Sequence, residues 1–248
     1  PGTIESHTAI TLDHRDIPHI AFYEKNDRDL WYATMENGQW TTELVDSEGW
    51  SGGGPDILID KFGKPHISYL MDHPIIHVKY AVKANNGWDV EKIGDDEIFG
   101  RATSLVLDDQ GTPHICYLFS WNLVLGSKPA DQWEFVNMFH EMQRGRSTSL
   151  EQDSLGRFHA GHTGISFGAT SQELNILYTR PEGTGWETEI IETFPFDDDD
   201  FVGWKESMML DGSDNPHMVY YAVEDQSLRY AVRESSSNWN IETIDDAG

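Results

Sequence analysis

The stretch LDDQGTPHICYL, residues 107–118, carries the pattern that decides the fold. The Asp, Gly and Pro that follow Leu107 predict a tight turn, in which Gly111 takes a positive φ and Pro113 closes the turn. The apolar run after Pro113 predicts a buried strand, and the residues before Asp108 alternate as a strand does. This stretch therefore predicts the connection between two strands of a β-hairpin.

The same pattern occurs four more times along the chain. The other copies are LDHRDIPHIAFY (12–23), IDKFGKPHISYL (59–70), QDSLGRFHAGHT (152–163) and LDGSDNPHMVYY (210–221). Each copy continues into an apolar and aromatic run and then into a run that contains a tryptophan. Every repeat thus predicts four short strands, and no segment between them shows a helical period.

Five repeats of four strands predict an all-β fold, a five-bladed β-propeller of four-stranded antiparallel blades, because radial repetition protects the sheet edges. We expect a single domain over residues 1–248. The expected blades span approximately residues 7–54, 55–102, 103–146, 147–205 and 206–248.

Residues that recur in every repeat are best explained by what every blade needs, which is packing. The recurring histidines are His19, His66, His114, His159 and His217, and the recurring tryptophans are Trp40, Trp88, Trp133, Trp186 and Trp239. We expect both sets to pack between neighbouring sheets. The outer-strand acids Glu43, Glu91, Glu189 and Glu242 are expected to face solvent. Cys116 is the only cysteine, so no intrachain disulfide forms, and its apolar setting predicts a buried residue.

The composition excludes several function classes. The chain has 43 acidic and 17 basic residues, a formal net charge of -26, so it repels nucleic acid and anionic lipid surfaces. No apolar stretch approaches the roughly 18 residues of a membrane span. We expect a monomer that binds a small molecule or saccharide. The chain begins at Pro1 and shows no targeting segment, which leaves secreted and cytoplasmic locations both open.

Motifs of several enzyme classes are missing from the sequence. There is no Gly-x-Ser-x-Gly elbow, no glycine-rich phosphate loop, no Cys-x-x-Cys pair and no dinucleotide fingerprint. Redox, kinase and serine-hydrolase functions lose support, and we expect no cofactor. A calcium ion at Asp197–Asp200 is an alternative to a solvated acidic loop. Asp72, His73 and His77 have a metal-like spacing, but a loop does not fix their geometry, so we predict no metal site.

The loops that depart from the repeat indicate where function lies. The turns between the first two and the last two strands of a blade are short, whereas the loops between the second and third strands and the links between blades are irregular. Function is commonly carried by such loops on a rigid scaffold. Arg101 in GRATSL (100–105) and Arg146 in GRSTSL (145–150) occupy matched links on adjacent blades, near Lys205.

A pair of arginines at the mouth of a propeller channel suits a carboxylate, sulfate or phosphate. The alternative is that they pair with Asp56, Glu206 or another internal acid. Other residues of the expected site lie mostly on the same face: Trp50, Trp121 and Trp204 as walls, His73 as a further contact, and His7, His162 and Tyr117 for proton transfer. His162 stands where the other repeats carry an aromatic residue, and its imidazole titrates near neutrality, so we expect it to transfer protons.

The repeat Asp-x-x-Gly-x-Pro-His-Ile-x-Tyr, followed by Leu-x-Tyr-Ala and Trp-x-x-Glu, resembles blades of the propeller lyases that act on ulvan. It resembles the sialidase-like and lectin propellers more loosely. The resemblance covers Thr8 to Asp245 and rests on scaffold residues. It implies a propeller in which a histidine and a tyrosine perform acid-base work while basic side chains neutralise a uronate carboxylate. Ulvan-type lyases are larger and have more blades.

These observations lead to two functional hypotheses. The first is an enzyme with one asymmetric site that performs lyase, isomerase or cyclase chemistry on an acidic saccharide or a small carbonyl or enol compound. The alternative is a carbohydrate-binding, lectin-like propeller without catalysis. A multivalent lectin should repeat its binding residues in every blade, and the divergent loops favour the first hypothesis.

Overall fold

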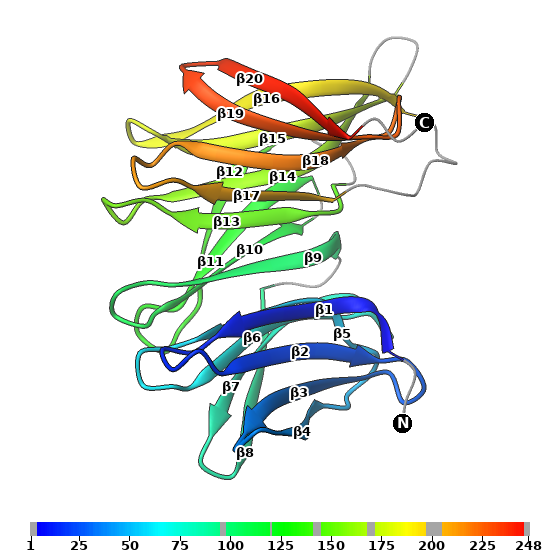
Figure 1. Ribbon diagram of the computed structural model, residues 1–248, viewed down its shortest axis with the longest axis vertical. Helices are drawn as coiled ribbons and strands as arrows, with labels where there is room; N and C mark the ends of the chain where they lie inside the picture. The colour runs from blue at the N-terminus through cyan, green and yellow to red at the C-terminus, as the bar shows by residue number, and fades with distance from the viewer. Residues whose placement is uncertain are drawn as a thin grey trace. The chain divides into compact units, whose positions relative to one another are not determined.

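The computed structural model describes residues 4–94, 98–119, 121–140, 145–167, 172–196 and 205–245. Its described strands form five sheets of four antiparallel strands, and the strands of each sheet pair in chain order (Figure 1). The chain divides into two compact units, Pro1–Tyr117 with Leu125–Val136, and Leu118–Val124 with Asn137–Gly248. None of the described segments is a helix that is long and apolar enough to cross a membrane.

Each sheet corresponds to one sequence repeat. The first contains β1 (Ile4–Leu12), β2 (Pro18–Glu24), β3 (Asp29–Glu36) and β4 (Gln39–Asp46). The second contains β5 (Ser51–Ile59), β6 (Pro65–Met71), β7 (His77–Ala84) and β8 (Gly87–Ile93). The third contains β9 (Ile98–Leu107), β10 (Pro113–Phe119), β11 (Asn122–Ser127) and β12 (Glu134–Phe139). The fourth contains β13 (Thr148–Gln152), β14 (Phe158–Phe167), β15 (Gln172–Glu182) and β16 (Gly185–Phe196), and the fifth β17 (Glu206–Leu210), β18 (Pro216–Ala222), β19 (Ser227–Ser235) and β20 (Asn238–Asp245).

The second and third sheets begin earlier than the repeat boundaries predict, at Ser51 and Ile98 rather than at residues 55 and 103. The segment Ser51–Gly54 looks like a loop in the sequence because it is rich in glycine. In the structure it pairs with β6, with register shifts on both sides of Gly53. Glycines with positive φ therefore bend β5 without ending it.

The aspartate of each repeat organises the turn that the sequence predicts. Asp60 Oδ1 accepts hydrogen bonds from the backbone N–H groups of Phe62 and Lys64, both at 2.8 Å. The residue at the glycine position has a positive φ in every repeat: Asp16 60°, Gly63 82°, Gly111 82°, Gly156 78° and Asp214 63°. The predicted turn is confirmed, and an aspartate replaces the glycine where the repeat lacks one.

The repeated histidine belongs to the scaffold, as predicted. In the second sheet His66 is buried, its Nδ1 lies 2.5 Å from the Tyr80 hydroxyl, and its Nε2 faces Asp60 at 3.5 Å. The Tyr80 ring meets Trp133 of the next sheet edge-on at 5.6 Å. The other pairs are His19–Tyr32, His159–Tyr178 and His217–Tyr230, whereas His114 binds Ser127.

The packing role of the repeated tryptophans is confirmed where neighbouring sheets of one unit meet. Trp88 packs edge-on against Tyr32 of the preceding sheet at 5.2 Å, and Trp239 packs in the same way against Tyr178 at 5.3 Å. Trp40 differs, because 49% of its surface is exposed. Aromatic contact between sheets thus joins the repeats, with buried aliphatic residues around it.

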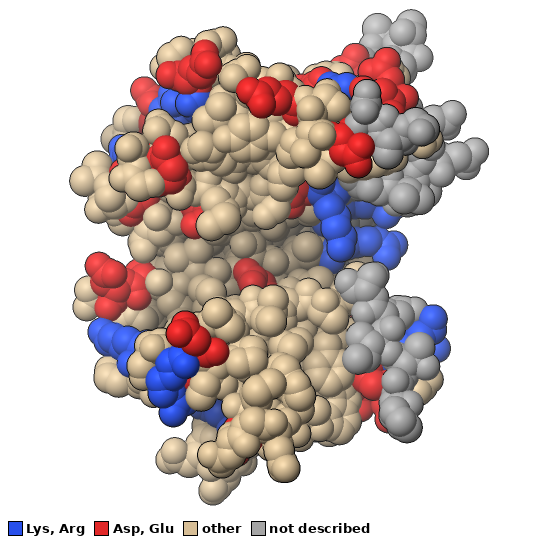
Figure 2. Space-filling model, in the orientation of Figure 1, with Lys and Arg blue, Asp and Glu red and all other residues tan. Residues whose placement is uncertain are grey.

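Three of the outer-strand glutamates, Glu43, Glu91 and Glu189, form ion pairs with the next sheet, which the sequence analysis missed. Glu43 pairs with Lys83, and Glu91 pairs with Lys128 at 2.6 Å. Glu189, which was expected to face solvent, is only 5% exposed, so that prediction was wrong. Figure 2 shows acidic side chains at several places on the face in view, with basic side chains beside some of them.

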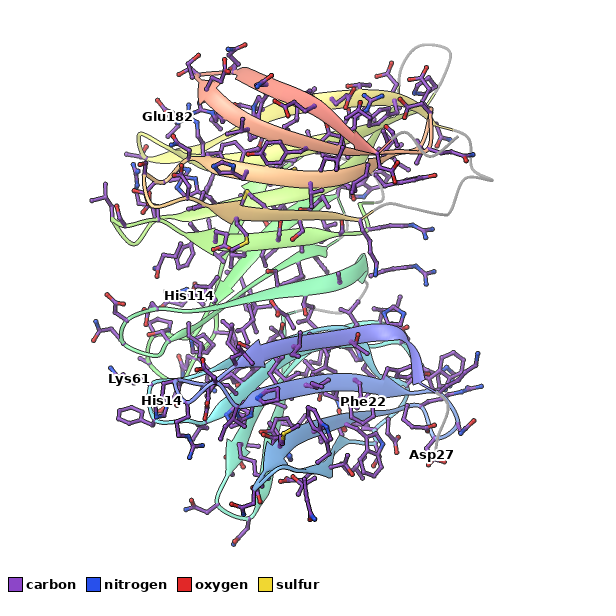
Figure 3. The ribbon with its side chains drawn as sticks, in the orientation of Figure 1. His14, Phe22, Asp27, Lys61, His114 and Glu182 are labelled. Atoms are coloured by element: carbon purple, nitrogen blue, oxygen red, sulfur yellow. The ribbon has the colours of Figure 1, made fainter. Side chains whose placement is uncertain are left out.

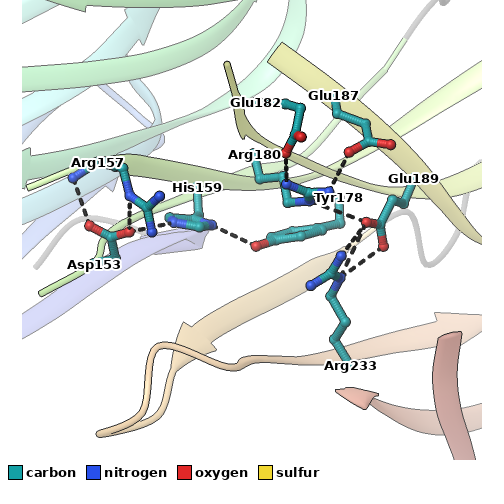
Figure 4. A network of polar contacts seen from close by, with 9 residues as sticks. All are labelled: Asp153, Arg157, His159, Tyr178, Arg180, Glu182, Glu187, Glu189 and Arg233. Carbon is teal, nitrogen blue, oxygen red and sulfur yellow. Dashed lines mark hydrogen bonds and ion pairs between the residues drawn. The ribbon is translucent and has the colours of Figure 1, made fainter. Parts of the chain in front are cut away.

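Glu189 is buried because three partners surround its carboxylate, and two of them, Arg180 and Arg233, are drawn in Figure 4. Arg233 of the next sheet donates to it at 2.7 and 3.0 Å, Trp239 Nε1 donates at 3.0 Å, and Arg180 Nε donates at 3.3 Å. Burial by itself raises the pKa of Glu189, but the bonds from Arg233 and Trp239 outweigh it, and the pKa is lowered.

Glu189→Gln is expected to reduce the free energy of unfolding by about 3 kcal/mol, because a largely buried Arg233 would lose its counterion. Glu187→Gln provides the control, since Glu187 pairs with the same Arg180 but its side chain is 43% exposed, and solvent-accessible pairs contribute at most about 1 kcal/mol. Urea unfolding of both variants measures the difference. Equal losses in the two variants would contradict the structural role of Glu189.

Candidate functional site

A pocket of about 320 Å³ opens in the first unit, at the end of the sheets that carries the irregular loops. Its lining residues are His7, Tyr23, Lys25, Arg28, Trp50, Gly53, Asp72 and Arg101. They come from the first halves of β1, β5 and β9, the end of β2, the β2–β3 and β6–β7 loops and the β4–β5 link. In Figure 3, Asp27 marks the β2–β3 loop at this end, and His14 and Lys61 mark the regular turns at the opposite end.

Gly54 brings two of the predicted site residues together. Its N–H donates to His7 Nδ1 at 3.2 Å, and its carbonyl accepts from the Thr103 hydroxyl at 3.2 Å. A Cβ on Gly54 would lie 2.2 Å from the carbonyl oxygen of Arg101, and its φ is +45°. Only glycine lets β5 approach β9 this closely, so the glycine run positions both His7 and Arg101.

The hydrogen bond from Gly54 also selects the tautomer of His7. A backbone N–H can only donate, so Nδ1 accepts and the proton of the neutral ring resides on Nε2. The imidazole lies edge-on to Tyr23, with ring centroids 6.3 Å apart. In its neutral form His7 is therefore prepared to donate a proton or a hydrogen bond through Nε2.

Trp50 is not a bare platform, although 39% of its surface is exposed. The Arg28 guanidinium lies 4.0 Å from the indole centroid, and the His73 ring stacks on the indole at 4.9 Å. The Asp72 N–H donates to the Trp50 carbonyl at 2.9 Å. Trp50 therefore holds a cation, an imidazole and the backbone of Asp72 at the edge of the pocket.

The charges in the pocket are unevenly matched. Lys25, Arg28 and Arg101 line it together with one carboxylate, Asp72. Within the described residues, neither Arg28 nor Arg101 forms an ion pair with a carboxylate. Burial raises the pKa of Asp72, and the nearby charges of Arg101 and His7 oppose that shift.

The internal acids considered as partners for the arginines are otherwise occupied. Asp56 accepts from the N–H groups of Leu105 and Ile57, both at 2.8 Å, and Glu206 accepts from the Ser149 hydroxyl at 2.6 Å. No described hydrogen bond joins either acid to an arginine. The first-unit pocket therefore presents Arg101 to an incoming ligand.

His162 does not line the first-unit pocket, and its catalytic role stays a prediction. It is fully buried in β14, its Nε2 lies 2.9 Å from the Thr179 hydroxyl, and its ring packs on Phe139 at 5.7 Å. The same repeat position holds Tyr69 and Tyr220, whose hydroxyls donate to Asp46 and Glu192 from the preceding sheet. His162 thus occupies a packing position, and burial lowers its pKa to about 3.

Tyr117 is also buried in β10, with its hydroxyl beside Gly94, and does not line the pocket. His73 contacts the pocket indirectly through Trp50. Trp121 is about half exposed, and its site role stays a prediction. Arg146 and Lys205 belong to the second unit, where the Arg146 N–H donates to the Thr163 hydroxyl at 3.2 Å, and their site roles also stay predictions.

Two expectations lie outside the described residues, namely Trp204 as a wall and calcium binding by Asp197–Asp200. Over the ranges that the structure does describe, no three His, Cys, Asp or Glu side chains form a group suited to a metal ion. The sequence analysis missed Tyr23, Lys25 and Arg28, and considered Asp72 only as a metal ligand. The sequence does contain a sign of the two cations, because the segment EKNDRD around the first β2–β3 loop includes both a lysine and an arginine.

No protein-family model and no curated protein sequence matches this chain. Similar solved structures cover nearly all of it. A protein of unknown function from Dyadobacter fermentans aligns with 100% of this chain and 85% of its own, at 11% identity and a TM-score of 0.65. An α-L-arabinofuranosidase from Fusarium graminearum covers 97% of this chain and 82% of its own, at 10% identity and TM-score 0.61.

A Hadza microbial sialidase, Hz136, covers 98% of this chain and 53% of its own, at 9% identity and a TM-score of 0.58. These structures and the five four-stranded sheets decide the architecture. The fold is a five-bladed β-propeller. The resemblance to sialidase-like propellers is therefore confirmed for the fold, and the pocket lies on the face of the first three blades that carries the links between blades.

Proposed function

We propose that this propeller binds a carboxylate-bearing saccharide in the first-unit pocket. One observation carries the proposal: Arg28 and Arg101 line the same pocket without a carboxylate partner among the described residues, on a chain with net charge -26. A protein so rich in carboxylates has many potential partners for each arginine. Two unpaired guanidiniums in one concave site indicate an anionic ligand, and the guanidinium fork matches a carboxylate.

The saccharide part of the proposal is supported by the similar propellers. The sialidase and the arabinofuranosidase are named for action on sugars, and both align with nearly the whole of this chain. The pocket also offers an aromatic wall at Tyr23 and Trp50 beside its polar groups. Its volume is at the lower end of the range for small-molecule sites, about 300–1,000 Å³, which suits recognition of one or a few sugar residues.

We further propose that the reaction at this site is β-elimination from a uronate. The described lining contains a single carboxylate, Asp72, whereas most glycoside hydrolases require a pair. In an elimination the arginines stabilise the charge that develops on the uronate carboxylate when a base removes the adjacent proton. Tyr23 or Asp72 would be that base, and His7 Nε2–H would protonate the departing glycosidic oxygen.

Binding of trigalacturonate, measured by calorimetry, tests the proposal. Arg28→Ala and Arg101→Ala are each expected to weaken binding at least 30-fold, because removal of one partner of a charged pair costs about 2–5 kcal/mol. Lys64→Ala removes the same charge from the exposed turn at the other end of blade two and should leave binding unchanged. Ultraviolet absorbance of the unsaturated product reports elimination.

Two outcomes would overturn parts of this proposal. Binding of trigalacturonate without an unsaturated product would remove the elimination step and leave a binding propeller. Binding of neutral sugars that survives both arginine substitutions would instead favour the lectin-like alternative and reject the carboxylate site.

A further inference from the structure

We infer that Asp72 determines which anions the pocket accepts: its carboxylate receives hydrogen bonds from sugar hydroxyls while the arginines hold the ligand carboxylate. The site then takes a polyhydroxy monocarboxylate, such as a uronate residue, and discriminates against anions without hydroxyl donors. This inference rests on the proposed function, because it names the ligand class of the same pocket.

The backbone holds Asp72 at the pocket while leaving its side chain available. The Asp72 N–H is bonded to the Trp50 carbonyl at 2.9 Å, which anchors the β6–β7 loop to the β4–β5 link. At Gly49 in that link, a Cβ would lie 2.2 Å from the His73 carbonyl oxygen, so the two segments are in close contact. The position of Asp72 is thus determined by main-chain contacts that do not involve its carboxylate.

The carboxylate itself is open to a ligand. Asp72 is an exposed residue whose carboxylate is partly shielded from water by its surroundings, and its side chain forms no hydrogen bond with any other residue that the structure describes. On β5, a Cβ added at Gly53 would come into van der Waals contact with the carboxylate, 3.5 Å from Oδ2 and 3.6 Å from Oδ1. The glycine therefore leaves space above the carboxylate, and both oxygens can accept hydrogen bonds from a ligand.

The surrounding charges explain why an acid at this position confers selectivity. Arg101 on β9 and His7 on β1 act electrostatically on Asp72, and Lys25 and Arg28 approach the pocket from the β2–β3 loop. A ligand anion is attracted to the cations but repelled by Asp72. A ligand whose hydroxyl groups donate hydrogen bonds to Asp72 offsets this repulsion, because hydrogen bonds to a charged acceptor are stronger than those between neutral groups.

A matched pair of probes tests this inference. D-galacturonate and acetate carry the same carboxylate, but only the sugar acid has hydroxyl donors. Asp72→Asn is expected to weaken galacturonate binding about tenfold, because a charged acceptor is lost. The same substitution should strengthen acetate binding about twofold or more, because a like charge is removed. Titrations followed by NMR at constant ionic strength measure both effects.

The controls separate this inference from the proposed function. Asp89→Asn removes an equivalent exposed charge from β8 and should change neither affinity, and unliganded melting of Asp72→Asn should match the wild type because no side-chain bond is lost. Wild-type protein that binds neither probe would reject the proposed function and this inference with it. If galacturonate binding depends on the arginines but Asp72→Asn leaves it unchanged or strengthens it, the role of Asp72 alone is rejected. An equal loss of affinity for galacturonate and for acetate in Asp72→Asn would also reject that role.

Discussion

Gly54→Ala is expected to lower the melting temperature by about 10 °C, which for a chain of this size corresponds to a loss of about 4 kcal/mol. The added Cβ would lie 2.2 Å from the Arg101 carbonyl oxygen and 2.5 Å from the Ala102 Cα, and both are backbone atoms. Relief would require β5 and β9 to separate. That movement would also break the bond from Gly54 to His7, so ligand binding should fall together with stability.

Gly63→Ala is the matched control for this substitution. Gly63 also has a positive φ, +82°, but a Cβ there would meet no atom within 4 Å. The control therefore measures only the cost of the backbone conformation, about 1 kcal/mol, or roughly 2–4 °C. Calorimetric melts of the two variants isolate the contribution of close packing, and similar decreases would show that β5 and β9 do not require glycine at residue 54.

The second large effect is expected from Glu206→Gln, through the pH dependence of stability. Glu206 is buried in blade five; its Oε2 accepts from the Ser149 hydroxyl at 2.6 Å, and its Oε1 has no partner among the described residues. Burial raises the pKa of Glu206 to about 7, and the bonds from Ser149 and Ser147 only partly oppose this shift. The folded state therefore holds a proton that the unfolded state releases near pH 4.5.

The sign of the pH effect follows from this difference. Between about pH 4.5 and 7 the unfolded state binds fewer protons than the folded state, so the free energy of unfolding decreases as the pH rises. Over that interval a shift of this size corresponds to about 3 kcal/mol. Glu206→Gln removes this decrease, so that the variant should gain stability relative to the wild type at pH 7. Urea unfolding at intervals from pH 4.5 to 7.5 measures the effect.

His162 changes the free energy of unfolding with pH in the direction opposite to Glu206, and it therefore provides an internal control. Its pKa in the folded state is lowered to about 3, so protonation of the unfolded state reduces stability as the pH falls below about 6.5. The two groups offset each other between about pH 4.5 and 6.5. In Glu206→Gln the His162 slope should emerge, and the additional change His162→Tyr should flatten it. If the free energy of unfolding of Glu206→Gln depends on pH in the same way as that of the wild type, Glu206 is ionised in the folded protein.

The part of the candidate site that was predictable came from departures from the repeat. No repeat requires Arg101, Trp50 or His7, and for that reason the sequence indicates them as site residues. The structure places all three around one pocket. Arg28 and Asp72 were missed as ligand contacts because their loops contain ordinary surface residues when read alone. Their relevance depends on neighbours that are distant along the chain, such as Trp50 for Arg28.

His162 is a departure from the repeat that does not line this pocket. Its position faces the preceding blade, where Tyr69 and Tyr220 bond to partly buried acids. Glu189 shows a limit of the sequence pattern. Alternation along β16 suggests that Glu189 lies on an exposed face, but Arg233 and Trp239 of the next blade cover that face. An alternating pattern identifies the two faces of a strand, but it does not show which face a neighbouring blade covers.

The sequence by itself determined the repeat, the four strands of each blade, the Asp–Gly turns and the scaffold role of the repeated histidines. These features depend on contacts between residues close in the chain, and five copies make the pattern unmistakable. The tertiary structure alone decided that Arg28, Asp72 and Arg101 share one pocket. Three blades meet there because glycines at positions 49 and 54 permit backbone contacts that larger residues would block, and such contacts leave no periodic trace in the sequence.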